Sequence, residues 1–204
     1  KYDILCLYII FSFMAQEIER QFVVDDQHPE WLRLREILPK SRLIQATIYR
    51  GERNKLRVRI IDDLQTGEKK AFFAFKVKHK TKKDEPTLRD EYEWEVPPRV
   101  ALYSMIGHIE VYKVRYHYIH TDGAVWDIDE YEGANAGIAL ADLELDAIHT
   151  NFSRPCFLGK ETTKNKNISN NSFSTHPYAN WSDEEKIAYH DLKQRVKMKK
   201  KDEK

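Results

Sequence analysis

The stretch Met14–Val24 reads MAQEIERQFVV, and it decides how the rest of the chain is interpreted. As a β-strand it has two faces, because successive side chains point in opposite directions. One face carries Glu17, Glu19 and Gln21, and the other carries Ile18, Arg20 and Phe22. Glutamate is rarely buried unless it is paired or bound to a metal. If the acidic face points inward, it therefore needs a cation.

Seven further stretches alternate in the same way and predict strands, at residues 42–50, 55–62, 70–80, 89–96, 109–120, 125–131 and 138–146. Short helices are predicted at 28–38, which Pro39 ends, and at 99–107. Thr121-Asp122-Gly123 predicts a hairpin turn. Eight strands joined by short turns predict an α+β, mainly β protein built on an antiparallel barrel or sandwich with flanking helices.

The charges of the predicted strands segregate by sign. Basic pairs occur at Arg57/Arg59, Lys76/Lys78 and Lys113/Arg115, and acidic sets occur at Glu17/Glu19, Glu91/Glu93/Glu95, Asp127/Asp129 and Asp142/Glu144. The strand 42–50 has no such set. A half-exposed sheet with its polar side in water explains any single strand equally well. Because a solvated surface usually mixes signs within a strand, the whole set favours a closed barrel with a charged, wet lumen.

A lumen with basic and acidic sides suits a polyphosphate bound together with a divalent metal. Arginine and lysine side chains bind phosphate oxygens. Carboxylates hold Mg²⁺ or Mn²⁺, which accept phosphate oxygens as further ligands. The pattern therefore indicates phosphoryl transfer to water, in which the protein mainly positions groups and neutralises charge.

Eight short motifs strengthen this interpretation: EIERQF, LRVRI, AFKVK, EYEWEVP, KVRY, WDIDEYEG, DLEL and FLGKETT. In this order, over roughly residues 15–181, the sequence resembles the CYTH superfamily of triphosphate tunnel metalloenzymes. The resemblance implies an eight-stranded antiparallel tunnel that acts on a triphosphate with Mg²⁺ or Mn²⁺. Members of the family include inorganic triphosphatases, thiamine triphosphatases, class IV adenylate cyclases and RNA triphosphatases.

The resemblance also implies roles for individual side chains. The implied metal ligands are Glu17, Glu19, Asp129, Asp142 and Glu144. The implied catalytic residues are Glu17, Glu19 and Lys113, since a first-strand carboxylate would orient the attacking water. The implied substrate-binding residues are Arg57, Arg59, Lys76, Lys113, Arg115 and Lys160.

Three departures from the family pattern bear on activity. Gln21 stands where the family has lysine, and the lost charge-assisted bond to phosphate is worth about 1.5–3 kcal/mol. Ala46-Thr47 replaces a Gly-Tyr pair, which leaves Lys113 without its tyrosine partner. Asp142 replaces glutamate and is one methylene shorter. The level of activity is therefore an open question at this point.

The first functional hypothesis is metal-dependent hydrolysis of a triphosphate, with inorganic triphosphate as the first candidate substrate. The alternatives are a tunnel that binds a triphosphate or nucleotide with weak or lost catalysis, a class IV-like adenylate cyclase, and a thiamine triphosphatase. The expected partner is a triphosphate-containing small molecule, bound by a monomer or homodimer. The net charge of +1 gives no general indication of nucleic acid or a membrane surface.

Composition and the two ends of the chain suggest its organisation. With 41% hydrophobic and 33% charged residues, the 204-residue chain is typical of a globular protein. Residues 1–13 are apolar but too short to span a bilayer, and we interpret them as an upstream or non-native leader rather than a signal segment. A cytoplasmic location follows from that interpretation. The tunnel domain is expected at 14–181, and 182–204 is expected to be a basic helix or tail, with nucleic-acid contact as the alternative role.

Overall fold

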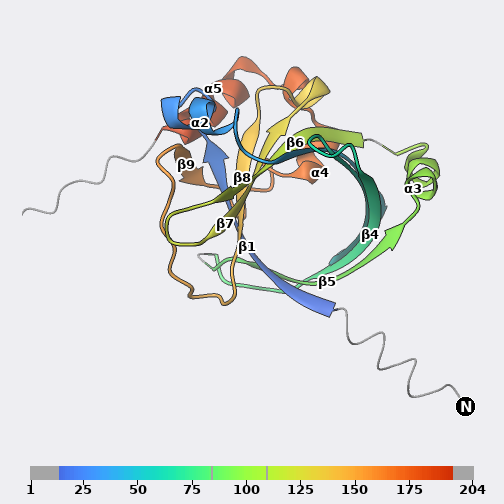
Figure 1. Cartoon of the computed structure of the whole chain (residues 1–204). Helices are drawn as coiled ribbons and strands as arrows, with labels where there is room; N and C mark the ends of the chain where they lie inside the picture. Colours follow the sequence, from blue (N-terminus) through green and yellow to red (C-terminus); the bar gives the residue numbers. More distant parts are fainter. Residues whose placement is uncertain (1–13, 84, 109, 195–204) are drawn as a thin grey trace, which may run out of the picture.

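The computed structural model describes residues 14–83, 85–108 and 110–194. Within them lie nine strands, of which eight close into an antiparallel barrel (Figure 1). The barrel strands are β1 (Met14–Val24), β2 (Lys40–Arg50), β3 (Asn54–Asp63), β4 (Lys69–Lys78), β5 (Thr87–Val96), β6 (Glu110–Ile119), β7 (Val125–Tyr131) and β8 (Ala139–Glu144). Of the two architectures left open by the sequence, the barrel forms because β1 pairs with both β5 and β8.

Strand β1 closes the barrel, and its pairing on both sides sets which face of the strand points toward the lumen. Its first half pairs with β5, where Glu17 lies opposite Arg89, and its second half pairs with β8. Glu17 and Glu19 line the interior cavity, as the alternation predicted. Ile18 and Phe22, on the other face, are buried in an apolar cluster outside the barrel.

The apolar core lies between the outer faces of the strands and the segments that cover them. Helix α2 (Pro29–Leu34) places Trp31 against the rings of Tyr116 and Phe157. Helix α3 (Pro98–Met105) buries Ala101 and Met105 against β2, β3 and β4. Most of the lumen is left to polar side chains. At one end, the inward-facing Val23, Tyr131 and Leu140 instead pack with residues of the C-terminal segment in a further apolar cluster.

The C-terminal helix α5 (Asp183–Lys193) is packed against the barrel. Ser182 and Glu185 form the capping box that the sequence contains. Tyr189 is buried, its hydroxyl donates to the Ala139 carbonyl, and the Ala139 N–H donates to that hydroxyl. Of the helix or tail expected at 182–204, a packed helix forms over Asp183–Lys193. Residues 1–13 and the basic residues 195–204 lie outside the described residues, and the predicted domain limits stay predictions.

Two parts of the fold differ from the sequence-based expectation. A short ninth strand, β9 (Leu158–Glu161), pairs with the end of β1 beyond β5. The helix predicted at 28–38 is shorter, from Pro29 to Leu34, and residues 35–37 form a turn before Pro39. The predicted turn at residues 121–123 joins β6 to β7, and Gly123 takes a φ of +84° there.

Three smaller elements complete the structure: the helix α4 (Asn170–Thr175) and the 3₁₀ turns η1 (Gly133–Asn135) and η2 (Tyr178–Asn180). Phe173 of α4 packs against Tyr131 and Trp181. Because Tyr131 is on the same face of β7 as Asp127 and lies opposite Lys113, the segment after β9 covers one end of the lumen. None of the helices in the described ranges is long and apolar enough to cross a bilayer.

Candidate active site

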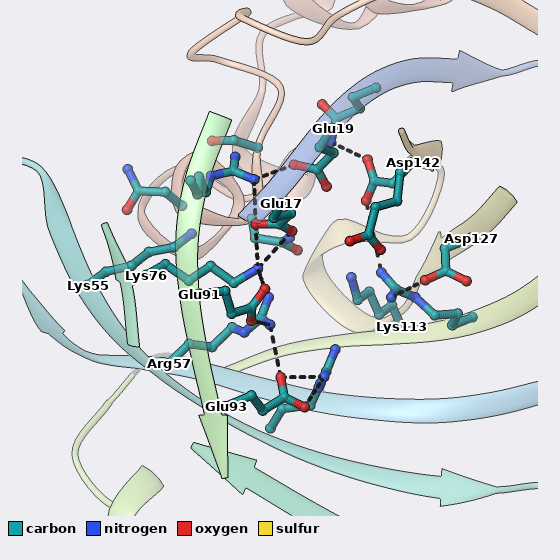
Figure 2. A pocket seen from close by; sticks show the side chains of 18 residues that line it. Glu17, Glu19, Lys55, Arg57, Lys76, Glu91, Glu93, Lys113, Asp127 and Asp142 are labelled. Atoms are coloured by element: carbon teal, nitrogen blue, oxygen red, sulfur yellow. Dashed lines mark hydrogen bonds and ion pairs between the residues drawn. The ribbon is translucent and has the colours of Figure 1, made fainter. Parts of the chain in front are cut away.

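The barrel encloses a charged cavity with a volume of about 320 Å³ (Figure 2). Its walls come from seven barrel strands and the N-terminal end of α4; of the described residues of β2, none lines it. β2 corresponds to the predicted strand without a charge set. The lining residues are Glu17, Glu19, Gln21, Lys55, Arg57, Arg59, Lys76, Arg89, Glu91, Glu93, Lys113, Arg115, Asp127, Asp142, Glu144, Ser169, Asn170 and Asn171.

Cations from β3 and β4 form one wall of the cavity, and glutamates of β5 neutralise part of it. Arg59 Nη2 lies 2.9 Å from both carboxylate oxygens of Glu93. Lys76 Nζ lies 2.9 Å from Glu17 Oε1 and 2.8 Å from Glu91 Oε2. The expected division into a basic and an acidic half is therefore corrected. The signs segregate by strand, but neighbouring strands of opposite sign pair with each other.

Arg89 of β5 joins the two glutamates of β1. Its Nη1 atom lies 3.2 Å from Glu17 Oε2 and also donates to Glu19 Oε2. Burial opposes ionisation of Glu17, but the charges of Lys76 and Arg89 outweigh burial and lower the pKa of Glu17 to about 2. Glu17 is thus ionised at neutral pH, and the cation that its strand required is supplied by the protein itself.

Lys113, Arg115 and Asp129 form a buried cluster where β6 meets β7. Asp129 is only 1% exposed and binds Lys113 Nζ as well as Arg115 Nε, the latter at 2.7 Å. Although burial opposes ionisation, Arg115 and Lys113 hold the pKa of Asp129 well below its usual range. Both carboxylate oxygens are occupied, and Asp129 does not line the cavity. Asp129 is thus held by the two cations in this structure, and its role as a metal ligand stays a prediction.

Carboxyl groups of β1 and β8 crowd together on the opposite side of the cavity. Glu19 lies directly across the strand pair from Glu144, and Asp142 is two residues before Glu144. Burial, followed by repulsion from Glu19 and Asp129, raises the pKa of Asp142 to about 8. Burial and repulsion from Glu17 also raise the pKa of Glu144. The carboxyl groups of Asp142 and Glu144 are unfavourable as anions, so a cation placed beside them would be stabilised.

This carboxyl cluster fits a hard divalent cation by its chemistry but is not a preformed metal centre. Carboxylate oxygens are ligands that Mg²⁺ and Mn²⁺ accept. In the described part of the chain, however, no three carboxylate, imidazole or thiolate groups converge closely enough to hold a metal ion. Glu17 and Glu19 bind Arg89 instead. Metal binding would therefore require these two side chains to exchange partners.

Comparison with known proteins shows which fold this arrangement of strands belongs to. The inorganic triphosphatase of Acetivibrio thermocellus is 27% identical over 173 residues, which cover 83% of this chain and all of that protein. The crystal structure of the inorganic triphosphatase NE1496 superposes with a TM-score of 0.51 at 22% identity, covering 78% of this chain and 97% of that one. The chain has the triphosphate tunnel fold. No family model matches it.

In this tunnel, Gln21 holds an acidic side chain in place. Its Nε2 donates to Asp142 Oδ1 at 3.0 Å, and its Oε1 accepts from Thr162 Oγ1 at 3.3 Å. Both ends of the amide are therefore used. The tunnel family has lysine at this position. In this chain the neutral amide of Gln21 stabilises Asp142, whether protonated or ionised, by hydrogen bonding alone.

Thr47, the second departure from the family pattern, does not lie next to Lys113 in the pairing of β2 with β6. The β2 residue directly opposite Lys113 is Leu43, which is 1% exposed. Thr47 instead lies opposite Arg57 of β3. Lys113 has another aromatic neighbour, because its Nζ lies 5.6 Å from the ring centre of Tyr131.

Most of the predicted site residues meet in the tunnel: Glu17, Glu19, Arg57, Arg59, Lys76, Lys113, Arg115, Asp142 and Glu144 all line it. Their individual roles remain predictions. Lys160 is an exception, since it is exposed on β9 and is absent from the lining. It lies on β9, which pairs with β1 outside the closed barrel, and its role in substrate binding stays a prediction.

Several lining residues were missed. Lys55 and Arg89 lie on the same alternate face as Arg57 and Glu91, so extending the period-two pattern by one position would have found them. Asn170 and Asn171 had no such signal. They reach the tunnel because α4 is anchored elsewhere: Phe173 is buried, and Tyr131 donates to Asn170 Oδ1 at 2.9 Å.

Proposed function

We propose that the protein is a metal-dependent triphosphatase that hydrolyses inorganic triphosphate in its tunnel. The observation that carries the proposal is the cavity itself, in which arginine and lysine side chains face a crowded carboxyl cluster within about 320 Å³. A cation wall suits phosphate oxygens, and the carboxyl cluster suits a divalent metal. The relative that is named an inorganic triphosphatase supports this substrate, since it matches over its whole length.

The phosphate-binding part of the site would consist of Arg57, Arg59, Lys76, Lys113 and Arg115, all of which line the tunnel. In the structure their charges are balanced by carboxylates, as in the Arg59–Glu93 and Arg115–Asp127 pairs. A triphosphate would compete with these glutamates and aspartates for the same N–H donors. The same ion pairs hold the cations oriented toward the lumen before substrate arrives. This limits the conformational reorganisation that substrate binding requires.

The metal site would be formed by Glu17, Glu19, Asp142 and Glu144. Bound Mg²⁺ or Mn²⁺ would neutralise charge on the phosphate oxygens. Glu17 or Glu19 would orient the attacking water by accepting its hydrogen bond, and Lys113 would donate to the phosphate. Asp142, whose pKa of about 8 favours the protonated form at neutral pH, would have to release its proton when the cation binds.

A tunnel that binds a triphosphate or nucleotide with weak turnover is the second candidate. Gln21 favours it, because this residue supplies no positive charge beside the substrate. Adenylate cyclase and thiamine triphosphatase activities are left to direct assay. A cytoplasmic location is part of the proposal, since Cys156 is an exposed free thiol, which is typical of a reducing compartment.

Phosphate release from inorganic triphosphate, ATP and thiamine triphosphate tests the proposal, with Mg²⁺, Mn²⁺ or a chelator. We expect release from inorganic triphosphate with either metal and none with the chelator. Glu19→Gln should reduce the rate at least about a hundredfold, whereas Glu36→Gln, at an exposed position, should not change it. Tight metal-dependent binding without release would refute hydrolysis and support the second candidate, and cyclic AMP formed from ATP would reassign the reaction.

A further inference from the structure

A histidine beside the tunnel is joined to one of the proposed phosphate-binding arginines through a shared carboxylate. His117 and Arg115 lie on the same face of β6, and Asp127 lies directly opposite His117 on β7. His117 Nδ1 is 2.8 Å from Asp127 Oδ1, and Arg115 Nη1 donates to Asp127 Oδ2 at 2.6 Å. Asp127 (Figure 2) and Arg115 both line the tunnel. His117 therefore reaches the tunnel wall through one intervening side chain.

The two aspartates of β7 hold Arg115 in different ways. Asp129 accepts from Arg115 Nε at 2.7 Å and from Nη2 at 2.8 Å, so this pair is bidentate. Asp127 accepts from Nη1 alone. The side chain of Asp129 is 1% exposed, whereas that of Asp127 is 30% exposed. The single, more accessible contact with Asp127 is therefore the one that an incoming phosphate oxygen can replace.

The charged groups around His117 come from three strands. They are Arg115 on β6, Asp127 and Asp129 on β7, and beyond them Asp142 on β8, which lies opposite Asp127. Toward β2, the His117 N–H donates to the Pro39 carbonyl, and Lys40 lies over the Tyr116 ring on the opposite face of β6. The hydrogen bond with Asp127 raises the pKa of His117, although burial opposes this rise. Since the side chain is 49% exposed, it exchanges protons with water.

We propose that His117 is a positioning residue for the triphosphate: when protonated, it binds Asp127 and so allows Arg115 to exchange Asp127 for a phosphate oxygen. The inference rests on the proposed function and concerns the same site. With a neutral imidazole, the charge of Asp127 is left to Arg115 and competes with the anion. With an imidazolium, Asp127 keeps a cationic partner after Arg115 has turned to the phosphate, so no unpaired carboxylate is left in the tunnel wall.

This arrangement makes triphosphate affinity depend on pH in a defined direction. Affinity should be higher below the pKa of His117 than above it. By linkage, bound triphosphate must raise the pKa of His117 by the corresponding amount. Protonation of the triphosphate itself also changes with pH, but it affects every variant equally. The ratio of the affinities of wild type and variant therefore isolates the contribution of His117.

Calorimetry of triphosphate binding in a chelator, at about pH 6 and about pH 9, tests this inference without turnover. His117→Gln removes the charge but still offers Asp127 a hydrogen bond, and His117→Lys carries a charge at both pH values. His176→Gln is the matched control, because His176 forms the same kind of pair with Glu185 on the surface. In parallel, NMR of the wild type would follow the imidazole of His117 through a pH titration with and without triphosphate.

Relative to His117→Gln, we expect the wild type and His176→Gln to bind about fivefold more tightly at the lower pH and equally at the higher pH. His117→Lys should keep this advantage at both. In the NMR titration, triphosphate should raise the pKa of His117 by about 0.7, which is the same fivefold effect.

The same affinity ratio of wild type to His117→Gln at both pH values would overturn the inference, as would a pKa of His117 that triphosphate leaves unchanged. A loss of stability in His117→Gln together with a constant ratio would assign His117 a structural role only. Absence of hydrolysis with Mg²⁺ or Mn²⁺ would refute the proposed function but not this inference, which is measured by binding alone.

Discussion

Among single residues, Arg89 is the one on which the structure depends most, because it binds both glutamates of β1. We predict that Arg89→Gln lowers the free energy of unfolding by about 2 kcal/mol, since it leaves Glu19 without its cation and Glu17 with Lys76 alone. Urea denaturation at pH 7 would measure the loss. Arg33→Gln is the control, because its ion pair with Glu30 is on the surface and should contribute nothing measurable. Equal effects of the two substitutions would contradict the assignment.

The pH dependence of stability has a testable contribution from Lys55. Its pKa is lowered to about 7 in the folded protein, mainly by burial, whereas the unfolded chain keeps the usual value near 10.5. Between these values the unfolded state binds more protons, so this group makes stability rise with pH, and its full destabilising effect is present below about pH 7. Lys55→Met should therefore stabilise the protein more at pH 6 than at pH 10, as measured by urea denaturation. The same gain at both pH values would refute the shift.

Gln21 is the residue at which the triphosphate family pattern and this chain differ most directly. Gln21→Lys would place a cation beside Asp142 and the proposed phosphate path, and we predict about a tenfold rise in kcat/KM for triphosphate. Gln21→Met removes the same hydrogen bonds without adding charge and should not produce this rise. If lysine and methionine gave the same kcat/KM, charge at position 21 would not limit activity.

At the scale of elements, the end of helix α5 packs closely against Gly159 of β9. A Cβ atom at Gly159 would lie 2.2 Å from the Leu192 carbonyl oxygen and 2.9 Å from Lys193 Cα. We predict that Gly159→Ala lowers the free energy of unfolding by about 2–3 kcal/mol, because helix backbone rather than a flexible side chain must move. Lys160→Ala, next to it and exposed, is the matched control for the same urea measurement. No difference between the two would show that α5 does not need this close approach.

The strands could be predicted because their alternation is local. The spans of β1 and β7 were predicted as observed, and the other barrel strands differ by a few residues at their ends. β9 could not be predicted, since its four residues form a strand only because the end of β1 offers free backbone groups. Asn170 and Asn171 of α4 were missed for the same reason, as contacts distant in sequence bring them to the tunnel.

At the scale of the whole molecule, barrel closure creates the site. The sequence predicted that charged faces would point inward, but it could not show that β5 would meet β1 and place Arg89 against Glu17. It also could not show that Asp129 would be enclosed by Lys113 and Arg115. Strand order determines which charges become neighbours, and strand order is a property of the closed sheet rather than of any one strand.

The central claim is that one tunnel holds both a divalent metal and a triphosphate. A crystal structure with Mn²⁺ and a non-hydrolysable triphosphate analogue tests this most directly, because anomalous scattering locates the metal independently of the phosphates. We expect the Mn²⁺ peak among Glu17, Glu19, Asp142 and Glu144, and phosphate oxygens on Arg57, Arg59 and Arg115. A tunnel that contains neither ligand at saturating concentrations, or Mn²⁺ bound outside the carboxyl cluster, would contradict the account.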